Sequence, residues 1–599
     1  MKVGAQTLMV WLLLSAGMVH AATDRSLEPP IVPAPAVIEM TGGTFTVDKE
    51  TQIVIANDPR ALAIAHYFGE QLFRIREFRP AIVQVENPAA VRKVIRFTLQ
   101  QTQSSPDPES YELEISSQGV QVAARDMRGL FYGATTLWQI LAADTAAADE
   151  IRLPALRISD TPRLRWRGLM LDSANRFQSV AFIKRFIDTM ALHKLNVLHW
   201  HLADDGAWRI ESRKYPKLAT NQGGAYSQRE ISEIVAYAAE RNVTIVPGIS
   251  LPAHAGAMIA AYPHLGAARP AADETRLLNV QETTFAFIGD VLGEIAQLFP
   301  SDYIHVGSGQ YPLQQWESSA DVQARMRELG VVNAQQLQAY FMQRVTALGR
   351  EQRRRIIGWD QYSNTGTPQQ TIAMTSRGLD GALGLSASGY DVVTSADALD
   401  FSRPQTSVLA NEPPGNGSVM RIEDVYAFDP APSALGAEDL GHLMGVEATI
   451  WTHRARSEAD VELLAFPRAA ALAEIAWTPS SRQRWSSFAG ALPVPLKRYA
   501  KLGVQYSDAA YRVAVTLHPT ADSPQRVRVE LSRQVPAGEI RYTTNGTEPT
   551  ARSPVYKDVL NVSAPTTVKA ASFLNNEPLS SAVTFDVTSG TIQSARATN

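Results

Sequence analysis

Hydrophobic and polar positions follow three successive patterns along this 599-residue chain. In the first, strand-like runs such as Tyr111–Ser116 and Gly119–Ala124 alternate apolar and polar residues, and an apolar helical run follows at residues 129–141. Strict alternation is typical of a strand that buries one face. From Arg163 onward, short apolar runs alternate with amphipathic helical runs, and after about residue 508 strand-like runs dominate. The pattern predicts three folded regions.

The middle region contains eight candidate strands separated by helical stretches. The candidate strands are, in order, Gly168–Asp172, Val197–His201, Thr244–Pro247, Tyr303–Val306, Arg355–Gly358, Thr371–Met374, Asp391–Thr394 and Leu443–Ala448. The helical stretches include Val180–Lys194, Gln228–Arg241, Thr283–Phe299 and Ala334–Arg350. This order predicts an α/β fold, a (β/α)8 TIM barrel. The region exceeds the ~250 residues typical of that fold, and we interpret the Pro-, Gly- and Ser-rich residues 398–441 as an insertion.

The amino-terminal residues have the pattern of an export signal. Lys2 supplies a positive charge, Leu8–Met18 is apolar, and Val19-His20-Ala21 fits a small-x-small cleavage site. The apolar run is too short to span a bilayer, and no other apolar stretch is long enough. We therefore expect residues 1–21 to be a cleaved signal peptide and the protein to be exported, either periplasmic or secreted. A buried amino-terminal helix is the alternative interpretation.

Composition narrows the classes of function. The net charge is −4, and no run of Lys or Arg suggests a surface for nucleic acid. Apolar residues make up 45% and charged residues 19% of the chain, as in an ordinary globular protein. There is no cysteine, which excludes disulfides, thiolate metal ligands and a cysteine nucleophile.

Four motifs carry a family resemblance. They read Gly129-Leu-Phe-Tyr-Gly-Ala-Thr-Thr-Leu-Trp-Gln139, His199-Trp-His-Leu-Ala-Asp204-Asp205-Gly-Ala-Trp208-Arg209, Tyr303-Ile-His-Val-Gly-Ser-Gly309-Gln310 and Phe466-Pro-Arg-Ala-Ala-Ala-Leu-Ala-Glu-Ile-Ala-Trp477. In this order the chain resembles glycoside hydrolase family 20, the β-N-acetylhexosaminidases. The resemblance implies a small α+β domain at residues 30–160, the barrel at 163–505 and a C-terminal β-sandwich module at 510–590. It implies neither a metal nor a cofactor.

The resemblance also implies a defect in the chemistry. In the family, the fourth barrel strand ends His-x-Gly-Gly-Asp-Glu. The Glu protonates the leaving oxygen. The Asp orients the acetamido group of the sugar, and the oxygen of that group attacks the anomeric carbon. Here Gly309 and Gln310 stand at those two positions. A glutamine amide cannot deliver a proton at neutral pH, and glycine has no side chain. A misplaced register is the alternative, but no acidic residue occurs between Asp302 and Glu317.

Other strand ends depart from the family as well. Side chains that in the family grip the sugar or line the acetamide pocket are replaced by Asn175, Ser376, Ala398 and His453. Carboxylates that the family has at three further positions are replaced by Gly248, Ser250 and Gln361. Retained positions include Asp204, Asp205 and His254, which in the family relay charge to the Glu. Beside Gln310 and Gly309, these three are our candidate catalytic positions. The candidate substrate-binding residues are Asn175, His199, Trp359, Asp400 and Trp451.

Two functions remain open at this point. The first is a non-hydrolytic protein that binds or senses a glycan containing N-acetylhexosamine, or that regulates a partner. In it the His-Trp-His and Asp-Asp segments serve as polar scaffolding. The second is a divergent glycosidase that uses a recruited acid, for which Asp172, Asp360, Asp400 and Glu447 are the candidates near predicted strand ends. Trp359 and Trp451 suit either a sugar platform or core packing. A metal site built from His199, His201, His254 and Asp204 is conceivable from the ligand types, but we predict none.

Overall fold

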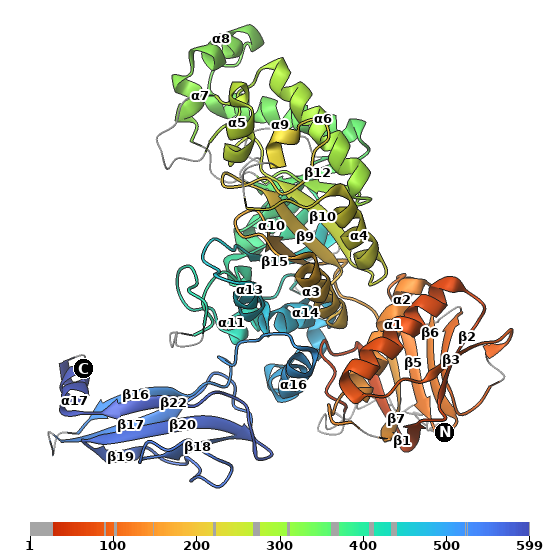
Figure 1. Cartoon of the computed structure of the whole chain (residues 1–599), viewed down its shortest axis with the longest axis vertical. Coiled ribbons are helices and arrows are strands. Elements are labelled where there is room, and N and C mark those ends of the chain that lie inside the picture. Colours follow the sequence, from red (N-terminus) through yellow and green to blue (C-terminus); the bar gives the residue numbers. More distant parts are fainter. Residues whose placement is uncertain are drawn as a thin grey trace, which may run out of the picture.

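The computed structural model describes residues 28–597 except 89–90, 101–104, 148, 220–222, 268–275, 308–311, 361–369, 407–411, 433–439, 521–522 and 524. Three folded regions follow one another along the chain (Figure 1). The predicted signal peptide at residues 1–21 lies outside the described residues, and so do Gly309, Gln310 and Gln361. Among the described residues, no helix combines the length and apolar character needed to cross a bilayer.

The first region is a seven-stranded sheet with helices α1 (Pro59–Arg76) and α2 (Met127–Leu141) packed against it (Figure 1). The order of the strands across the sheet is β1 (Val37–Asp48), β7 (Glu150–Asp160), β5 (Tyr111–Ser116), β6 (Gly119–Ala124), β4 (Ile95–Leu99), β2 (Gln52–Ile55) and β3 (Ala81–Gln84). Asp126 begins α2 by accepting a hydrogen bond from the backbone of Arg128. The next thirteen residues after Arg128 are all buried, which explains the unbroken apolar run in the sequence.

The second region is a closed barrel of eight parallel strands. In order around the barrel these are β8 (Trp166–Asp172), β9 (Val197–Ala203), β10 (Thr244–Ile249), β11 (Tyr303–His305), β12 (Arg355–Trp359), β13 (Ile372–Thr375), β14 (Val392–Thr394) and β15 (Leu443–Ile450), which pairs with β8. All eight predicted strands and the predicted fold class are confirmed. Because the strands are parallel, their carboxyl ends meet at one mouth, where the active sites of such barrels lie.

Helices connect the barrel strands and follow the last of them. They are α3 (Val180–Leu192), α4 (Gln228–Ala239), α5 (Gly256–Ala261), α6 (Glu282–Leu298), α7 (Gln314–Ser318), α8 (Ala320–Leu329), α9 (Ala334–Glu351), α10 (Gly378–Ala387), α11 (Ile422–Tyr426), α13 (Glu458–Ala465), α14 (Arg468–Trp477), α15 (Trp485–Ala491) and α16 (Pro493–Leu502). Several of the helices, including α4, α9, α10 and α14, pack against the strands. The four helices expected from the sequence are present, with ends shifted by up to two residues.

A buried arginine is one of the contacts that tie the predicted insertion to helix α14. Arg468, fully buried at the start of α14, donates hydrogen bonds to the carbonyl oxygens of Phe401 (2.6 Å) and Arg403 (3.0 Å). Burial lowers the pKa of Arg468 to about 9, with Asp400 opposing the shift. The described part of residues 398–441 is therefore docked against α14.

The third region has two antiparallel sheets that share one core. One sheet contains β16 (Ala514–Pro519), β17 (Arg526–Ser532) and β19 (Leu560–Ser563); the other contains β18 (Glu539–Thr543), β20 (Thr566–Leu574), β21 (Glu577–Pro578) and β22 (Val583–Val587), and α17 (Ser589–Ala597) follows. Val527, Val529 and Val562 of the first sheet pack with Val568 and Val587 of the second. This is a β-sandwich, as the sequence predicts.

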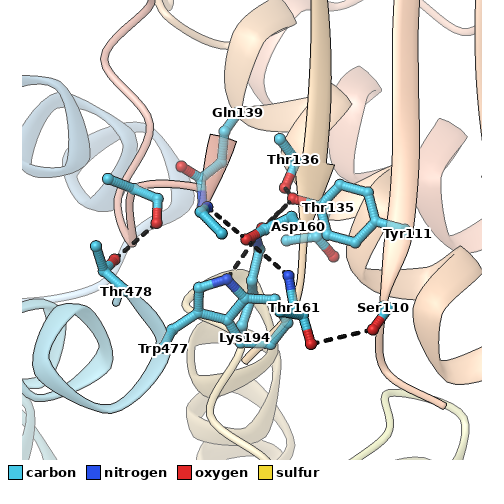
Figure 2. A network of polar contacts seen from close by, with 12 residues as sticks. Ser110, Tyr111, Thr135, Thr136, Gln139, Asp160, Thr161, Lys194, Trp477 and Thr478 are labelled. Atoms are coloured by element: carbon cyan, nitrogen blue, oxygen red, sulfur yellow. Dashed lines mark hydrogen bonds and ion pairs between the residues drawn. The ribbon is translucent and has the colours of Figure 1, made fainter. Parts of the chain in front are cut away.

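A buried polar network joins the first region to the barrel (Figure 2). Asp160 ends β7, and its Oδ2 lies 3.0 Å from the ammonium of Lys194, which follows α3. The same oxygen accepts hydrogen bonds from the Tyr111 hydroxyl and from the Trp477 indole nitrogen at 2.9 Å. Both charged side chains are fully buried. A buried ion pair is tolerated when further hydrogen bonds satisfy it, and here the partners come from both regions.

Candidate active site

Beneath the mouth, the interior of the barrel holds a buried polar core. His199 on β9 bonds through Nδ1 to Oε1 of Glu447 on β15 at 2.8 Å, and the Trp166 indole donates to the other oxygen of Glu447 at 3.1 Å. The His199 ring lies 4.2 Å from that of His305, the last residue of β11. Burial raises the pKa of Glu447 to about 8 and lowers the pKa values of both histidines well below their usual range. His199 therefore lies inside the barrel, with an exposed fraction of only 2%.

Two glycines make room for this core. A Cβ atom added at Gly168 would lie 2.7 Å from Oε2 of Glu447, and one added at Gly248 would lie 2.5 Å from Nε2 of His199. Such distances are shorter than real side chains allow. Gly248 is one of the positions at which the family resemblance implies a carboxylate. A side chain at residue 248 would therefore require the His199 ring to shift from the position it has here.

At the mouth, the structure brings Asp204, Asp205 and His254 together. Nδ1 of His254 lies 3.2 Å from an oxygen of each carboxylate, and Asp204 also contacts Nε2 of His201 at 3.0 Å. Burial opposes protonation of His254, but its hydrogen bonds to Asp204 and Asp205 outweigh burial and raise its pKa to about 10. His254 has a φ of 56°, a left-handed conformation that is uncommon outside glycine. The left-handed backbone at His254 thus places its protonated ring at the mouth of the barrel.

Asp204, Asp205 and His254 are residue types that bind metal ions, and here they form an ion pair with one another. Their ligand atoms all lie within 4.8 Å of one another. A metal ion at this place would have to displace the proton that the two carboxylates favour on His254. Asp205 also accepts hydrogen bonds from the backbone N–H groups of Gly256 (2.9 Å) and Arg276 (3.1 Å), which occupy one of its oxygens.

Two half-buried indoles flank the mouth. Trp359 is the last residue of β12, and its ring lies 5.7 Å from that of His305, at 78°. Trp451 follows β15, and its ring lies 5.3 Å from that of His201, at 77°. Each indole therefore packs against a histidine edge-to-face and keeps part of its surface accessible. This arrangement suits a platform for a sugar ring.

Asn175 lies beside the mouth, tied to the end of β8. Asp172 accepts hydrogen bonds from the backbone (2.9 Å) and the side chain (2.8 Å) of Asn175, and from the backbone (3.0 Å) and hydroxyl (3.1 Å) of Thr452. The neighbouring Arg176 donates instead to the carbonyl oxygen of Arg456, so its guanidinium is engaged outside this cluster. Thr452 was not a candidate in the sequence; it lies directly after Trp451, which is the only signal that could have marked it.

The carboxyl groups considered as recruited acids occupy different environments. Asp360 is buried, and its Oδ2 accepts hydrogen bonds from the Arg377 guanidinium (2.6 Å) and the Thr375 hydroxyl (2.5 Å). Asp400 is half-buried, and one of its oxygens accepts the backbone N–H of Ser402 at 3.0 Å. Asp172 and Glu447 are fully buried in the contacts described above.

Known proteins resemble the chain along most of its length. Residues 164–480 match the family model for the catalytic domain of glycosyl hydrolase family 20, residues 28–161 match domain 2 of the same family, and residues 519–584 match the chitobiase/beta-hexosaminidase C-terminal domain. A beta-hexosaminidase of Porphyromonas gingivalis is 30% identical over 559 residues, 88% of this chain and 70% of that protein. A beta-N-acetylhexosaminidase of Cellulomonas fimi is 28% identical, covering 77% of this chain and 92% of its own.

Solved structures agree. A family 20 exo-β-N-acetylglucosaminidase from Vibrio harveyi, in complex with N-acetylglucosamine, has a TM-score of 0.72 and 28% identity over 80% of this chain and 78% of its own. The family 20 β-N-acetylhexosaminidase of Streptomyces coelicolor has a TM-score of 0.69 and 28% identity over 80% of this chain and 97% of its own. The similarity thus includes both the barrel and the region that precedes it.

Proposed function

The chain belongs to glycosyl hydrolase family 20, and on that premise we propose that it binds a glycan containing N-acetylhexosamine without hydrolysing it. The observation that carries the proposal is the pair Gly309-Gln310, which follows β11 where the resemblance implies Asp-Glu. Glutamine has no proton to transfer at neutral pH. A positioned general acid contributes roughly 10²–10⁴-fold, so its loss alone leaves hydrolysis slow.

The surroundings of three carboxyl groups support this proposal, because a substitute acid must reach the leaving oxygen with a proton to give. Glu447 is fully buried, with one oxygen bonded to His199 and the other to Trp166. Asp360 forms an ion pair with Arg377. Asp172 accepts four hydrogen bonds that hold the ends of β8 and β15 together, which leaves it no role as a donor.

One relative, known in two structures, supplies further support. The Vibrio harveyi protein is described in complex with N-acetylglucosamine, and a variant of it in which one aspartate is replaced by alanine is described as inactive. In that relative, a single lost carboxylate goes with lost activity, whereas here the resemblance implies that both members of the catalytic pair are lost. The half-buried Trp359 and Trp451 retain a surface on which a sugar ring can stack.

A divergent glycosidase is the second candidate, and Asp400 is the residue that favours it. Asp400 is half-buried beside the end of β15, where it pairs with Thr449. Among the described residues only the backbone N–H of Ser402 donates to its carboxylate, which leaves one oxygen available to a ligand. Asp400→Asn is therefore the variant that separates the two functions.

The test combines hydrolysis and binding of N,N′-diacetylchitobiose, whose unactivated leaving group depends on a general acid. We expect the native protein to bind the sugar and to release no N-acetylglucosamine, and Trp451→Ala to weaken binding. The double variant Gly309→Asp/Gln310→Glu is the matched gain-of-function control, and any turnover it gains would locate the sugar next to β11. Turnover by the native protein that Asp400→Asn abolishes would overturn the proposal and establish the second candidate.

We also propose that the protein is exported, on the strength of the Lys2, Leu8–Met18 and Ala21 pattern. Amino-terminal sequencing of the protein from its native cell should begin at Ala22. A mature protein that retains residues 1–21 would contradict this.

A further inference from the structure

A second hollow lies at the opposite end of the barrel from the mouth. It has a volume of about 520 Å³ and is lined by the first residues of four neighbouring strands, Trp166, Val197, Thr244 and Tyr303. The loop that contains Asp107 and Glu109, from the amino-terminal region, forms its other side. Ligand pockets typically have volumes of ~300–1,000 Å³ and often lie between domains, so both size and place fit a binding site.

An aromatic pair forms one wall of this hollow and is held rigidly. The Tyr303 ring is half-buried and packs edge-to-face on the Trp166 ring, with centroids 5.6 Å apart at 62°. Trp166 is itself fixed, because its indole nitrogen donates to Glu447 in the barrel interior at 3.1 Å. The exposed part of Tyr303 is therefore a preorganised apolar surface at the edge of the hollow.

Fixed polar groups form the opposite wall. The Glu109 carboxylate accepts hydrogen bonds from the Arg167 guanidinium (2.8 Å) and from the side-chain amide of Asn196 (3.2 Å). One oxygen of Asp107 accepts the backbone N–H of Glu109 at 2.8 Å. These contacts hold acceptor oxygens in place at the rim without using all of their lone pairs.

Other polar groups that line the hollow are available to hydrogen-bond to a ligand. Within the part of the chain that the structure describes, the Tyr303 hydroxyl and the side chains of Asn242, Thr244 and Arg165 make no hydrogen bond. Donors and acceptors thus surround a tyrosine ring. The charged residues of the lining are Asp107, Glu109, Arg128 and Arg165, so two negative charges balance two positive ones. A lining without net charge favours a neutral ligand over an ion of either sign.

We propose that this hollow binds a neutral saccharide of one or two rings. The apolar face of a pyranose packs on Tyr303, and the hydroxyl groups around it bond to Asp107, Asn242 and Thr244. Since the amino-terminal region and the barrel both contribute, the bound sugar bridges them. This site needs nothing from Gly309 and Gln310, and it does not depend on what the mouth binds.

The test measures binding of cellobiose and of N,N′-diacetylchitobiose by calorimetry to the full chain. Thr244→Trp, at an exposed strand start, should fill the hollow and abolish one binding component, and Tyr303→Ser should weaken that component roughly tenfold. Tyr303→Phe keeps the ring and should weaken it less. Thr516→Trp, at an exposed strand position in the sandwich, is the matched control and should leave binding unchanged.

Trp451→Ala separates the two sites. The inference is supported if a binding component survives Trp451→Ala and disappears in Thr244→Trp. It is overturned if neither sugar binds, or if every component survives Thr244→Trp and Tyr303→Ser. A binding component that is lost only in Trp451→Ala comes from sugar bound at the mouth. The calorimetry therefore distinguishes failure of this inference from failure of the proposed function.

Discussion

At the scale of single residues, the barrel interior shows what a side chain at residue 248 would meet. Gly248 stands where the family resemblance implies a carboxylate, and here the His199 ring lies directly beside it. Any side chain added at this residue would require His199 to shift. Interiors are close-packed, so such positions tolerate little added volume.

Gly248→Glu should therefore destabilise the fold by about 1–3 kcal/mol, the usual cost of overpacking. Urea unfolding followed by circular dichroism measures the effect. Gly384→Glu is the matched control, since nothing lies within 4 Å of a Cβ there and α10 already holds that residue in a helix. An unchanged unfolding midpoint for Gly248→Glu would show that His199 does not occupy this space in solution.

The His254 ion pair predicts a specific pH dependence. Folding raises the pKa of His254 from about 6.5 in the unfolded chain to about 10 in the native protein. The protonated side chain therefore stabilises the fold fully below pH 6.5, and this stabilisation is lost as the pH rises to the folded pKa. The melting-temperature difference between the native protein and His254→Gln should therefore begin to shrink near pH 6.5, persist in part at pH 8 and be nearly lost above pH 10. A difference that already disappears between pH 6 and pH 7 would contradict the ion pair.

At the scale of elements, the sequence predicts the strands well and the site less well. The eight barrel strands are almost entirely buried, so each appears as a short apolar run. The end of α3 is harder to predict. The helix ends at Leu192 rather than Lys194, because Lys194 adopts a φ of 58° and joins a network that no local pattern encodes.

The candidate site shows the same limit. The spacing of His199 and His201 puts both on one face of β9, but only the structure shows that His199 bonds to Glu447 while His201 faces Asp204 and Trp451. These contacts join strands far apart in sequence. The spacing of the motifs therefore predicts which residue types lie near the mouth. Which of these side chains a ligand can contact depends on tertiary packing, which the spacing does not encode.

Arg468 provides a test at this scale. Arg468→Leu should remove its hydrogen bonds to the carbonyl oxygens of Phe401 and Arg403 and cost at least ~2 kcal/mol, because the acceptors stay buried. Limited proteolysis should then cut within residues 398–441 faster than in the native protein. Arg229→Leu, at an exposed position on α4, is the control. Equal cleavage rates for both variants would contradict the docking of this segment.

At the scale of the whole molecule, the Lys194–Asp160 pair makes the amino-terminal region and the barrel one cooperative unit. Lys194→Met leaves the Asp160 carboxylate buried without its ammonium partner, which typically costs about 3–5 kcal/mol. We expect a lower unfolding midpoint in urea, and Lys184→Met, which removes a surface pair with Glu233, should cost no more than ~1 kcal/mol. Equal effects of the two variants would show that the buried pair does not hold these regions together.

The whole molecule also presents two ends with different chemistry. The mouth holds the half-buried Trp359 and Trp451 beside the imidazolium of His254, and the opposite end holds the hollow beside Tyr303. If the proposed function holds, a barrel that does not hydrolyse its ligand still serves as a rigid frame for two sugar sites. In this account the family fold is kept for binding, while the catalytic pair after β11 is not.

The most direct test of the central claim is release of N-acetylglucosamine from unactivated N,N′-diacetylchitobiose by the native protein, followed by chromatography over long incubation between pH 5 and pH 8. The account predicts no release above the rate of a buffer blank, because Gly309 and Gln310 provide neither the orienting carboxylate nor the proton. Turnover that scales with protein concentration and disappears in Asp400→Asn would contradict it.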